Sequence, residues 1–301
     1  MSSRSTPSFG QNSYWPCPAK LNLFLQIIGQ RSDGYHLLQS YFQLLDVGDQ
    51  LSIIPTEQAQ ISFSCSNPSL QNDDNLVVKA ANLLQSKSNT PWGAKLHLLK
   101  KLPIGGGVGG GSSDCATCLL ALNKLWQCGF SLKQLAAIGE SLGADVAFFI
   151  YGQSGFVEGI GEKITPYPIP NAHFLVIQPS CSIATSEIFS NPLLTRNSKA
   201  ITIRDLKTLS LPFDGFNTLQ SLVVDSYPLV KNALEWLTSR SSTARMTGSG
   251  SSLFSVFDNQ QEASKIAAQC DSSWQVFVAR GVNLSGLHDE LGYTFESQSS
   301  G

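Results

Sequence analysis

The chain of 301 residues is long enough for one large domain or two ordinary ones, with a sizeable hydrophobic core. Only 14% of the residues are charged and the net charge is −2, which excludes the basic surface of a nucleic-acid-binding protein and favours a small-molecule partner. Seven cysteines without disulfide-like spacing suit a reducing cytoplasm. The first 13 residues lack the apolar core of a signal peptide, and no apolar stretch approaches the length of a membrane span, so we expect a cytoplasmic protein without a membrane partner.

The first predicted element is a β-strand over residues 20–28, where side chains alternate in character. Its apolar face consists of Leu21, Leu23, Leu25 and Ile27. Lys20 and Asn22 share the opposite face, about 7 Å apart along the strand. That face is either solvated or holds a polar ligand, and the rigid Pro16-Cys17-Pro18 segment before it favours the ligand.

A turn at Asp33-Gly34 is followed by a strand-like run over residues 35–45. Tyr35 and His36 come directly after this turn, where their rings either pack in the ordinary way or grip a planar group. Turn residues at 46–49 separate this run from further strands predicted at 51–54 and 61–63. A helix at 75–84 and a strand at 94–99 complete this part of the chain.

A glycine-rich loop then leads into an amphipathic helical pattern. The loop backbone can approach a bulky anion closely, because glycine tolerates positive φ and has no side chain. We expect Ser112 or Ser113 to cap the helix and Gly129 to end it, so that the free N–H groups of the first turn bind a phosphate. The predicted ATP-binding loop consists of Pro103, Ile104, Gly105, Gly106, Gly107, Val108, Gly109, Gly110, Gly111, Ser112 and Ser113.

Two common nucleotide-binding motifs fit this loop badly. A Walker A loop ends in Gly-Lys-Ser/Thr, whereas Gly111 is followed by two serines and no lysine. The G-x-G-x-x-G match is almost automatic in so glycine-dense a run, and no acidic residue follows about 20 residues later at the end of a second strand. A flexible linker is also disfavoured, since an ordered helix follows the glycines.

A second helix is predicted over residues 131–142, capped by Ser131 and ended by Gly143. Asp145 stands at the mouth of the apolar run 146–150. Since burying an unpaired charge is costly, this carboxylate is either a helix cap, an ion-pair partner or a catalytic group. Cys115 and Cys118 lie on the previous helix without a second ligand pair, so we assign no metal site to them.

Three prolines, Pro166, Pro168 and Pro170, indicate a linker. Beyond it we predict strands at 173–177, 253–257 and 275–279, a short helix at 185–189, a long helix at 217–237 and a helix at 262–270. This mixture is typical of an α+β domain. The Gly/Ser-rich segment 247–252, with Gly248, Ser249 and Gly250, is either a tight turn or a second wall that faces the glycine loop.

These motifs together resemble the GHMP kinase superfamily. Residues 103–113 match its phosphate loop with Val108 in place of leucine, residues 18–23 match Pro-Ala-Lys-Leu-Asn-Leu, and residues 31–36 match Arg-x-Asp-Gly-Tyr-His. The resemblance is greatest to its branch of 4-diphosphocytidyl-2-C-methyl-D-erythritol kinases, enzymes of non-mevalonate isoprenoid biosynthesis.

Two further motifs complete the resemblance and include departures from the family pattern. Residues 143–147 match Gly-Ala-Asp-Val-Pro with Ala147 in place of proline, and residues 247–251 match the last glycine motif. Asp114 stands where we would expect asparagine. This extra carboxylate either favours the start of the helix or contributes to magnesium binding.

The resemblance implies an α+β fold of two domains. The expected layout is a flexible extension over residues 1–16, an ATP-binding domain over 17–165 that is like domain 2 of ribosomal protein S5, and a ferredoxin-like domain over 166–301. It implies ATP and Mg²⁺ as cofactors and a cytidine-diphosphate-linked methylerythritol as substrate. For the assembly state we expect a monomer or weak homodimer.

The resemblance also implies the roles of individual residues. Asp145 corresponds to the general base for the substrate's 2-hydroxyl, and Lys20 to its partner. Tyr35 and Phe189 correspond to the residues that sandwich the cytosine, His36 to a hydrogen-bonding partner of that base, and Asn22 and Thr185 to other substrate contacts. Two alternatives remain open at this point: a GHMP kinase for homoserine, mevalonate or a sugar, and a nucleotide-binding sensor that has lost catalysis.

Overall fold

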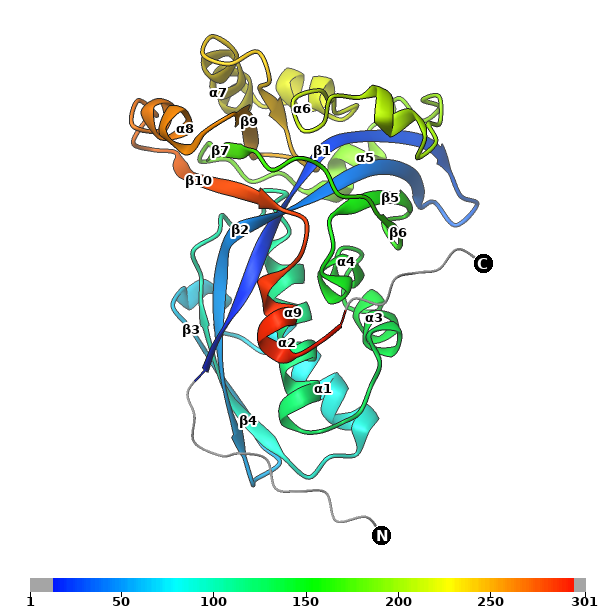
Figure 1. Ribbon diagram of the computed structural model, residues 1–301, viewed down its shortest axis with the longest axis vertical. Coiled ribbons are helices and arrows are strands. Elements are labelled where there is room, and N and C mark those ends of the chain that lie inside the picture. Colours follow the sequence, from blue (N-terminus) through cyan, green and yellow to red (C-terminus); the bar gives the residue numbers. More distant parts are fainter. Residues whose placement is uncertain (1–12, 295–301) are drawn as a thin grey trace.

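Two long antiparallel strands run through the whole molecule in the computed structural model, which describes residues 13–294 (Figure 1). They are β1 (Ser13–Gln30) and β2 (His36–Thr56), joined by the turn at Asp33-Gly34. Helices α1 to α4 and α9 gather around the lower half of this pair, and α5 to α8 lie around the upper half. The long strands therefore connect the two parts of the fold.

The strands belong to one ten-stranded sheet with the order β3-β4-β2-β10-β7-β9-β8, in which β1 pairs with β2, and β5 pairs with β2 and β6. Most neighbours are antiparallel, whereas β3 and β4 are parallel. The remaining strands are β3 (Ile61–Cys65), β4 (Gly93–Leu99), β5 (Gly155–Gly159), β6 (Lys163–Pro166), β7 (His173–Gln178), β8 (Arg245–Met246), β9 (Leu253–Phe257) and β10 (Gln275–Val282).

Strand β1 begins earlier than predicted, and both of its faces are buried. Residues 13–16, expected in a flexible extension, already pair with β2, from Ser13 opposite Ile53 to Pro16 opposite Gln50. The other residues of that predicted extension, 1–12, lie outside the described part of the chain. The face that carries Lys20 and Asn22 is buried like the apolar face, because other elements cover both sides of the strand.

The turn predicted at residues 46–49 is wrong, since β2 continues through it. Cross-strand pairing explains the difference: Gly48 pairs with Pro18 and Asp49 with Cys17 on one side, while Leu45 pairs with Gly281 on the other. A Cβ at Gly48 would lie 1.9 Å from the carbonyl oxygen of Cys17, so glycine is needed here for close strand approach.

The helices of the first half are α1 (Leu76–Ser88), α2 (Gly110–Leu125), α3 (Leu132–Glu140) and α4 (Val146–Tyr151). Asn75 caps α1, and Ser131 caps α3 in a capping box with Gln134, as predicted for Ser131. Helix α3 ends at Glu140 rather than at Gly143. These helices bury one apolar face against the sheet and make the larger hydrophobic core.

The second half contains α5 (Thr185–Ser190), α6 (Gln220–Ser226), α7 (Pro228–Thr238) and α8 (Gln260–Ala267), with short 3₁₀ turns at Pro68–Leu70 and Asp205–Thr208. The single long helix predicted at 217–237 is wrong. It is two helices that meet at Tyr227, where the backbone is extended, because Pro228 disfavours a helical predecessor and occupies the first position of α7.

The last described elements, β10 and α9, pack against elements of the first half of the chain. Strand β10 pairs with both β7 and β2, and α9 (Gly286–Leu291) lies beside α2 (Figure 1). The Tyr293 hydroxyl donates to the backbone carbonyl of Leu120 at 3.0 Å. The domain boundary near residue 165 stays a prediction. Within residues 13–294, no helix combines the length and apolar character that crossing a membrane would need.

Arg245 of β8 ties the second half to β1. Its buried guanidinium donates to five backbone carbonyls at 2.6–3.2 Å, those of Leu23, Pro212, Phe213, Thr243 and Asp214. Burial lowers the pKa of Arg245 to about 10. The guanidinium also lies 4.6 Å from the ring centroid of Phe254. One side chain therefore satisfies acceptors from three separate segments.

We predict that Arg245→Met lowers the free energy of unfolding by about 2–4 kcal/mol, because several buried carbonyls lose their donor. Arg204→Met is the matched control, since Arg204 is exposed, and we expect it to change stability by less than about 0.5 kcal/mol. Urea denaturation of the two variants and wild type measures both effects. Equal stabilities for the two variants would contradict this role of Arg245.

Candidate active site

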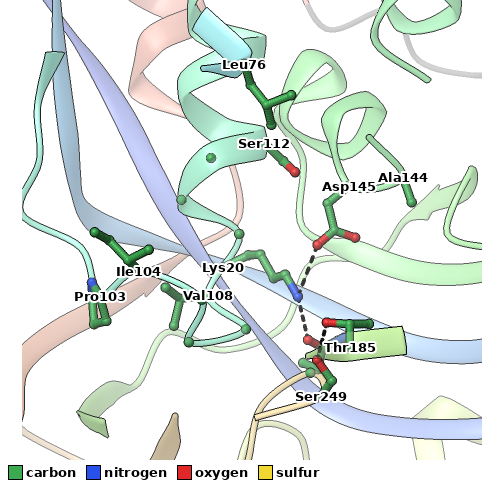
Figure 2. A pocket seen from close by; sticks show the side chains of 18 of the residues that line it. Lys20, Leu76, Pro103, Ile104, Val108, Ser112, Ala144, Asp145, Thr185 and Ser249 are labelled. Carbon is green, nitrogen blue, oxygen red and sulfur yellow. Dashed lines mark hydrogen bonds and ion pairs between the residues drawn. The ribbon is translucent and has the colours of Figure 1, made fainter. Parts of the chain in front are cut away.

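A cavity of about 980 Å³ lies where β1, the glycine-rich loop and the starts of α2 and α4 meet. A volume of this size is suited to a large polar ligand or two adjacent ones. Figure 2 shows Lys20, Asp145, Ser112, Thr185 and Ser249 around it. The other predicted site residues on its wall are Asn22, Tyr35, His36, Pro103, Ile104, Gly105, Gly106, Gly107, Val108, Gly109, Gly110, Gly111, Phe189 and Gly248.

Lys20 and Asp145 come from distant parts of the chain and form an ion pair, with Lys20 Nζ 3.4 Å from Asp145 Oδ2 (Figure 2). Lys20 is only 3% exposed. Its Nζ also donates to Asn22 Oδ1 at 2.6 Å and lies 4.7 Å from the ring centroid of Phe42. The amide, carboxylate and aromatic ring together stabilise the buried ammonium.

Asp145 keeps its carboxylate available to the cavity. It occupies the N-cap position of α4, but its side chain makes no capping hydrogen bond. The side chain is 30% exposed, and within residues 13–294 its one polar contact is Lys20. The interpretation of Asp145 as a helix cap is therefore wrong, and the carboxylate has free acceptor positions for a ligand proton.

The glycine-rich loop is fixed to β1 through a backbone hydrogen bond from Lys20 N to Val108 O at 2.9 Å. Helix α2 begins at Gly110, and the N-cap is Gly109 with φ 76°, so neither Ser112 nor Ser113 caps it as we expected. A Cβ at Gly109 would come within 3.0 Å of Lys20 Cγ and closer to the Phe149 ring, which excludes other residues there. The first N–H groups of α2 are left for an anion.

The second Gly/Ser segment packs against the first loop. Ser252 N donates to Gly106 O at 3.2 Å, and Thr247 Oγ1 accepts from Asn22 N at 2.9 Å. Ser249 Oγ lies 2.8 Å from Thr185 Oγ1, on the cavity wall (Figure 2). The segment is thus more than a tight turn, because it links the glycine-rich loop, β1 and α5.

Tyr35, His36 and Phe189 lie at one end of the cavity. The His36 and Phe189 rings are 5.2 Å apart between centroids and tilted by 46°. Tyr35 is 61% exposed and leaves its ring face open. Burial, and then the charge of Arg196, lower the pKa of His36. This end offers aromatic faces and a neutral imidazole to a planar group.

Two predicted site residues do not reach the cavity. Ser113 is fully buried inside α2, because the helix starts earlier than we expected, and Gly250 lies behind Ser249 in its turn. Sequence reasoning missed Phe42, Lys100 and the polar residues Asn72, Asp74 and Asn75, all of which line the cavity. A polar run before α1, Asn72-Asp73-Asp74-Asn75, is the local sequence feature that indicates this part of the cavity wall. Phe42 and Lys100 reach the site only through tertiary packing.

The comparisons with known proteins decide the family. The family model for the GHMP kinases N terminal domain matches residues 75–153, and the one for the GHMP kinases C terminal region matches residues 196–275. The 4-diphosphocytidyl-2-C-methyl-D-erythritol kinase of Pseudomonas aeruginosa is 48% identical over 276 residues, which covers 92% of this chain and 96% of that protein. The chain belongs to the GHMP kinase family.

Other relatives of this GHMP kinase agree with that assignment. The Pseudoalteromonas atlantica protein of the same name is 45% identical over 281 residues, with 93% of this chain and 96% of that protein covered. A crystal structure of a 4-(cytidine 5'-diphospho)-2C-methyl-D-erythritol kinase superposes with a TM-score of 0.79 at 27% identity, over 89% of this chain and 99% of that one.

A more distant structure has the same fold. The Methanococcus jannaschii mevalonate kinase gives a TM-score of 0.67 at 16% identity, over 91% of this chain and 99% of that one. The mixed α/β GHMP kinase fold expected from the sequence motifs is therefore confirmed. Membership in the family also implies that the protein uses ATP.

Behind the glycine-rich loop, this GHMP kinase contains a buried cluster of Asp49, Lys100 and Asp114. Lys100 Nζ forms ion pairs with Asp49 and, at 2.9 Å, with Asp114 Oδ2. Asp49 Oδ1 also accepts from the backbone N–H of Leu102 at 2.8 Å. Asp114 is therefore paired with Lys100, a role that the local sequence does not predict.

The cluster contains one more carboxylate than its single lysine neutralises. Burial and the neighbouring Asp49 raise the pKa of Asp114 to about 7, although Lys100 opposes this shift. Asp114 Oδ1 has no hydrogen-bond partner within residues 13–294. Since the folded protein binds a proton at Asp114 more tightly than the unfolded chain, its contribution to stability falls as pH rises from about 4 to 7.

We predict that Asp114→Asn, which cannot ionise, stabilises the protein at pH 8 by on the order of 1–3 kcal/mol. The stability difference from wild type should shrink as pH falls from about 7 to 4, because wild-type Asp114 is then protonated. Denaturation at several pH values measures it, with Asp225→Asn as an exposed control. A variant that is less stable than wild type at pH 8 would contradict this account.

Proposed function

We propose that the protein is an ATP-dependent kinase that phosphorylates the 2-hydroxyl of 4-diphosphocytidyl-2-C-methyl-D-erythritol in non-mevalonate isoprenoid biosynthesis. Its near-full-length similarity to kinases of this name carries the proposal. The site adds chemical support, because a single cavity joins the Lys20–Asp145 pair, the glycine-rich loop and an aromatic end that suits a pyrimidine.

Asp145 is the proposed general base. Its available carboxylate oxygens accept the proton of the 2-hydroxyl while the hydroxyl oxygen bonds to the terminal phosphorus of ATP and ADP leaves. Lys20 Nζ, 3.4 Å from Asp145 Oδ2, orients this carboxylate and places a positive charge beside the transferred phosphoryl group. Asn22 in turn holds the ammonium in place through its 2.6 Å hydrogen bond.

The glycine-rich loop and the start of α2 are the proposed phosphate site. Gly109 has the conformation and the close contacts of a cradle that a larger residue would fill, and the N–H groups of the first turn of α2 point out of the helix end. Residues 105–112 therefore fit the triphosphate of ATP, and they stabilise negative charge that develops during transfer.

Magnesium is proposed as the ion that accompanies ATP and neutralises phosphate charge. Among residues 13–294 no group of three or more His, Cys, Asp or Glu side chains forms a metal cage. Mg²⁺ commonly takes most of its ligands from phosphates and water, with one or two from the protein. The Asp145 carboxylate and the Ser112 hydroxyl, both on the cavity wall, are oxygen donors that fit this need.

Tyr35, His36 and Phe189 are the proposed cytosine site, and Thr185 is a further substrate contact. Aromatic rings on both sides of a base contribute about 1–3 kcal/mol for each stacked base. The cytidylyl group would thus anchor a small sugar whose own polar groups face the Lys20–Asp145 pair. The cytoplasmic location and the monomer or weak homodimer remain predictions from the sequence.

We predict that purified protein with Mg²⁺ and ATP releases ADP in the presence of the cytidylyl substrate and not with mevalonate or homoserine. Asp145→Asn should lower kcat by about 10²- to 10⁴-fold, since the general base is lost. Asp289→Asn, on α9, is the matched control and should keep wild-type kcat. Release with another acceptor would keep the family and change the substrate, whereas ATP binding without any release would favour a sensor.

We predict that Tyr35→Ala raises the KM for the cytidylyl substrate by about 10- to 100-fold through loss of base stacking, and leaves the KM for ATP unchanged. Tyr14→Ala removes another exposed tyrosine and should change neither constant. Steady-state kinetics with each substrate varied in turn measure the effect. An unchanged KM for the cytidylyl substrate in Tyr35→Ala would count against this placement of the base.

A further inference from the structure

Arg196 contacts two of the three residues proposed to hold the cytosine, His36 and Phe189. Its Nε donates to Nε2 of His36 at 3.0 Å, and its Nη2 donates to the backbone carbonyl of Phe189 at 3.2 Å. None of the motifs that carry the family resemblance includes this residue. One side chain thus joins the start of β2 to the end of α5, which lie near each other in the upper part of Figure 1.

The rest of the guanidinium is also fixed. Nη2 donates to Asn191 O at 2.9 Å, and Nη1 donates to Leu194 O at 3.1 Å. Asn191 is the C-cap of α5, so Arg196 satisfies carbonyls that the helix end leaves free. Because the guanidinium is planar and rigid, these bonds determine the direction in which its Nε–H points.

The contact with Arg196 determines where His36 carries its proton. Arginine can only donate hydrogen bonds, so Nε2 of His36 must be the acceptor. A neutral imidazole that accepts through Nε2 carries its proton on Nδ1. His36 lines the cavity, and its Nδ1 has no hydrogen-bond partner within residues 13–294. The Nδ1–H group is therefore a donor that remains available for a ligand.

We propose that Arg196 is a positioning residue that keeps His36 in the neutral Nδ1–H form, so that its ring donates a hydrogen bond to an acceptor atom of the substrate's pyrimidine. The identity of the ligand rests on the proposed function. The proton's position on the ring does not, since it follows from the contacts of the free protein.

The other charged groups near His36 interact with partners of their own, so Arg196 is the charged residue that acts on its ring. In the turn before His36, Arg31 and Asp33 form an ion pair with each other at 2.6 Å. On α5, the side chain of Glu187 interacts with Tyr227. Apart from burial, the charge of Arg196 is the cause that lowers the pKa of His36, so the ring is neutral at pH 7.

The first test reads the tautomer directly by ¹⁵N NMR of the histidine rings in the full-length protein without ligand. The chain has four histidines, and His36→Gln identifies the signals of His36. We expect a protonated Nδ1 and an unprotonated Nε2 at pH 7.5. A proton on Nε2 would overturn the proposal, and this test requires no variant of Arg196 and no substrate.

The second test is the pH dependence of the KM for the cytidylyl substrate in Arg196→Met. At pH 8 we expect KM to rise about tenfold, the equivalent of one hydrogen bond of about 1.4 kcal/mol, with kcat and the KM for ATP within about twofold of wild type. At a pH low enough to protonate the ring, both of its nitrogens carry hydrogen, so the variant should recover most of its affinity. Wild type should show no such recovery.

Arg204→Met, which alters an exposed arginine in the same half of the chain, is the matched control and should behave like wild type at every pH. A tenfold loss in Arg196→Met that stays the same when the pH is lowered until the ¹⁵N signals show a protonated His36 ring would mean that Arg196 only supports α5, and it would overturn the proposal. If the protein shows no activity with the cytidylyl substrate, the proposed function fails while the NMR result still decides the tautomer.

Discussion

The ammonium group of Lys20 is buried, and a buried charge is stable only when it is paired. Its partners come from Asn22 on the same strand and from Asp145 at the start of α4. The backbone of Lys20 also binds the carbonyl of Val108, and its side chain fits against Gly109. The requirement to pair one lysine therefore brings β1, the glycine-rich loop and α4 to a single point.

The walls of the cavity differ in burial and in hydrogen bonding, and this difference suits their proposed roles. The phosphate side is supported by the buried Asp49–Lys100–Asp114 cluster and by hydrogen bonds between the two glycine-containing segments. The cytosine side is more exposed, with Tyr35 on a turn and Thr185 at the start of α5. On this side, Arg196 links His36 to the end of that helix through hydrogen bonds to His36 and to the backbone carbonyl of Phe189.

Much of the fold followed from local sequence rules, as for the strand at 253–257 and the Ser131 cap, which the structure confirms. The predictions failed where contacts between distant parts of the chain determine the local structure. Strand β2 passes through the turn residues 46–49 because β1 and β10 pair with it on both sides of that segment. Helix α2 starts at Gly110 because the contact between Lys20 and Gly109 fixes the loop. The family motifs located most of the cavity wall, whereas Arg196 and Phe42 reach the site by tertiary packing alone.

The most direct measurement of the central claim is ³¹P NMR of the reaction product. Transfer to the 2-hydroxyl gives a phosphomonoester on a carbon that carries a methyl group and no hydrogen, beside an intact diphosphate. We therefore expect a new monoester signal without splitting by a neighbouring carbon-bound hydrogen, and a far slower appearance of that signal with Asp145→Asn. A split monoester signal would place the phosphate on another hydroxyl, and loss of the diphosphate signals would indicate hydrolysis; either result would contradict this account of the site.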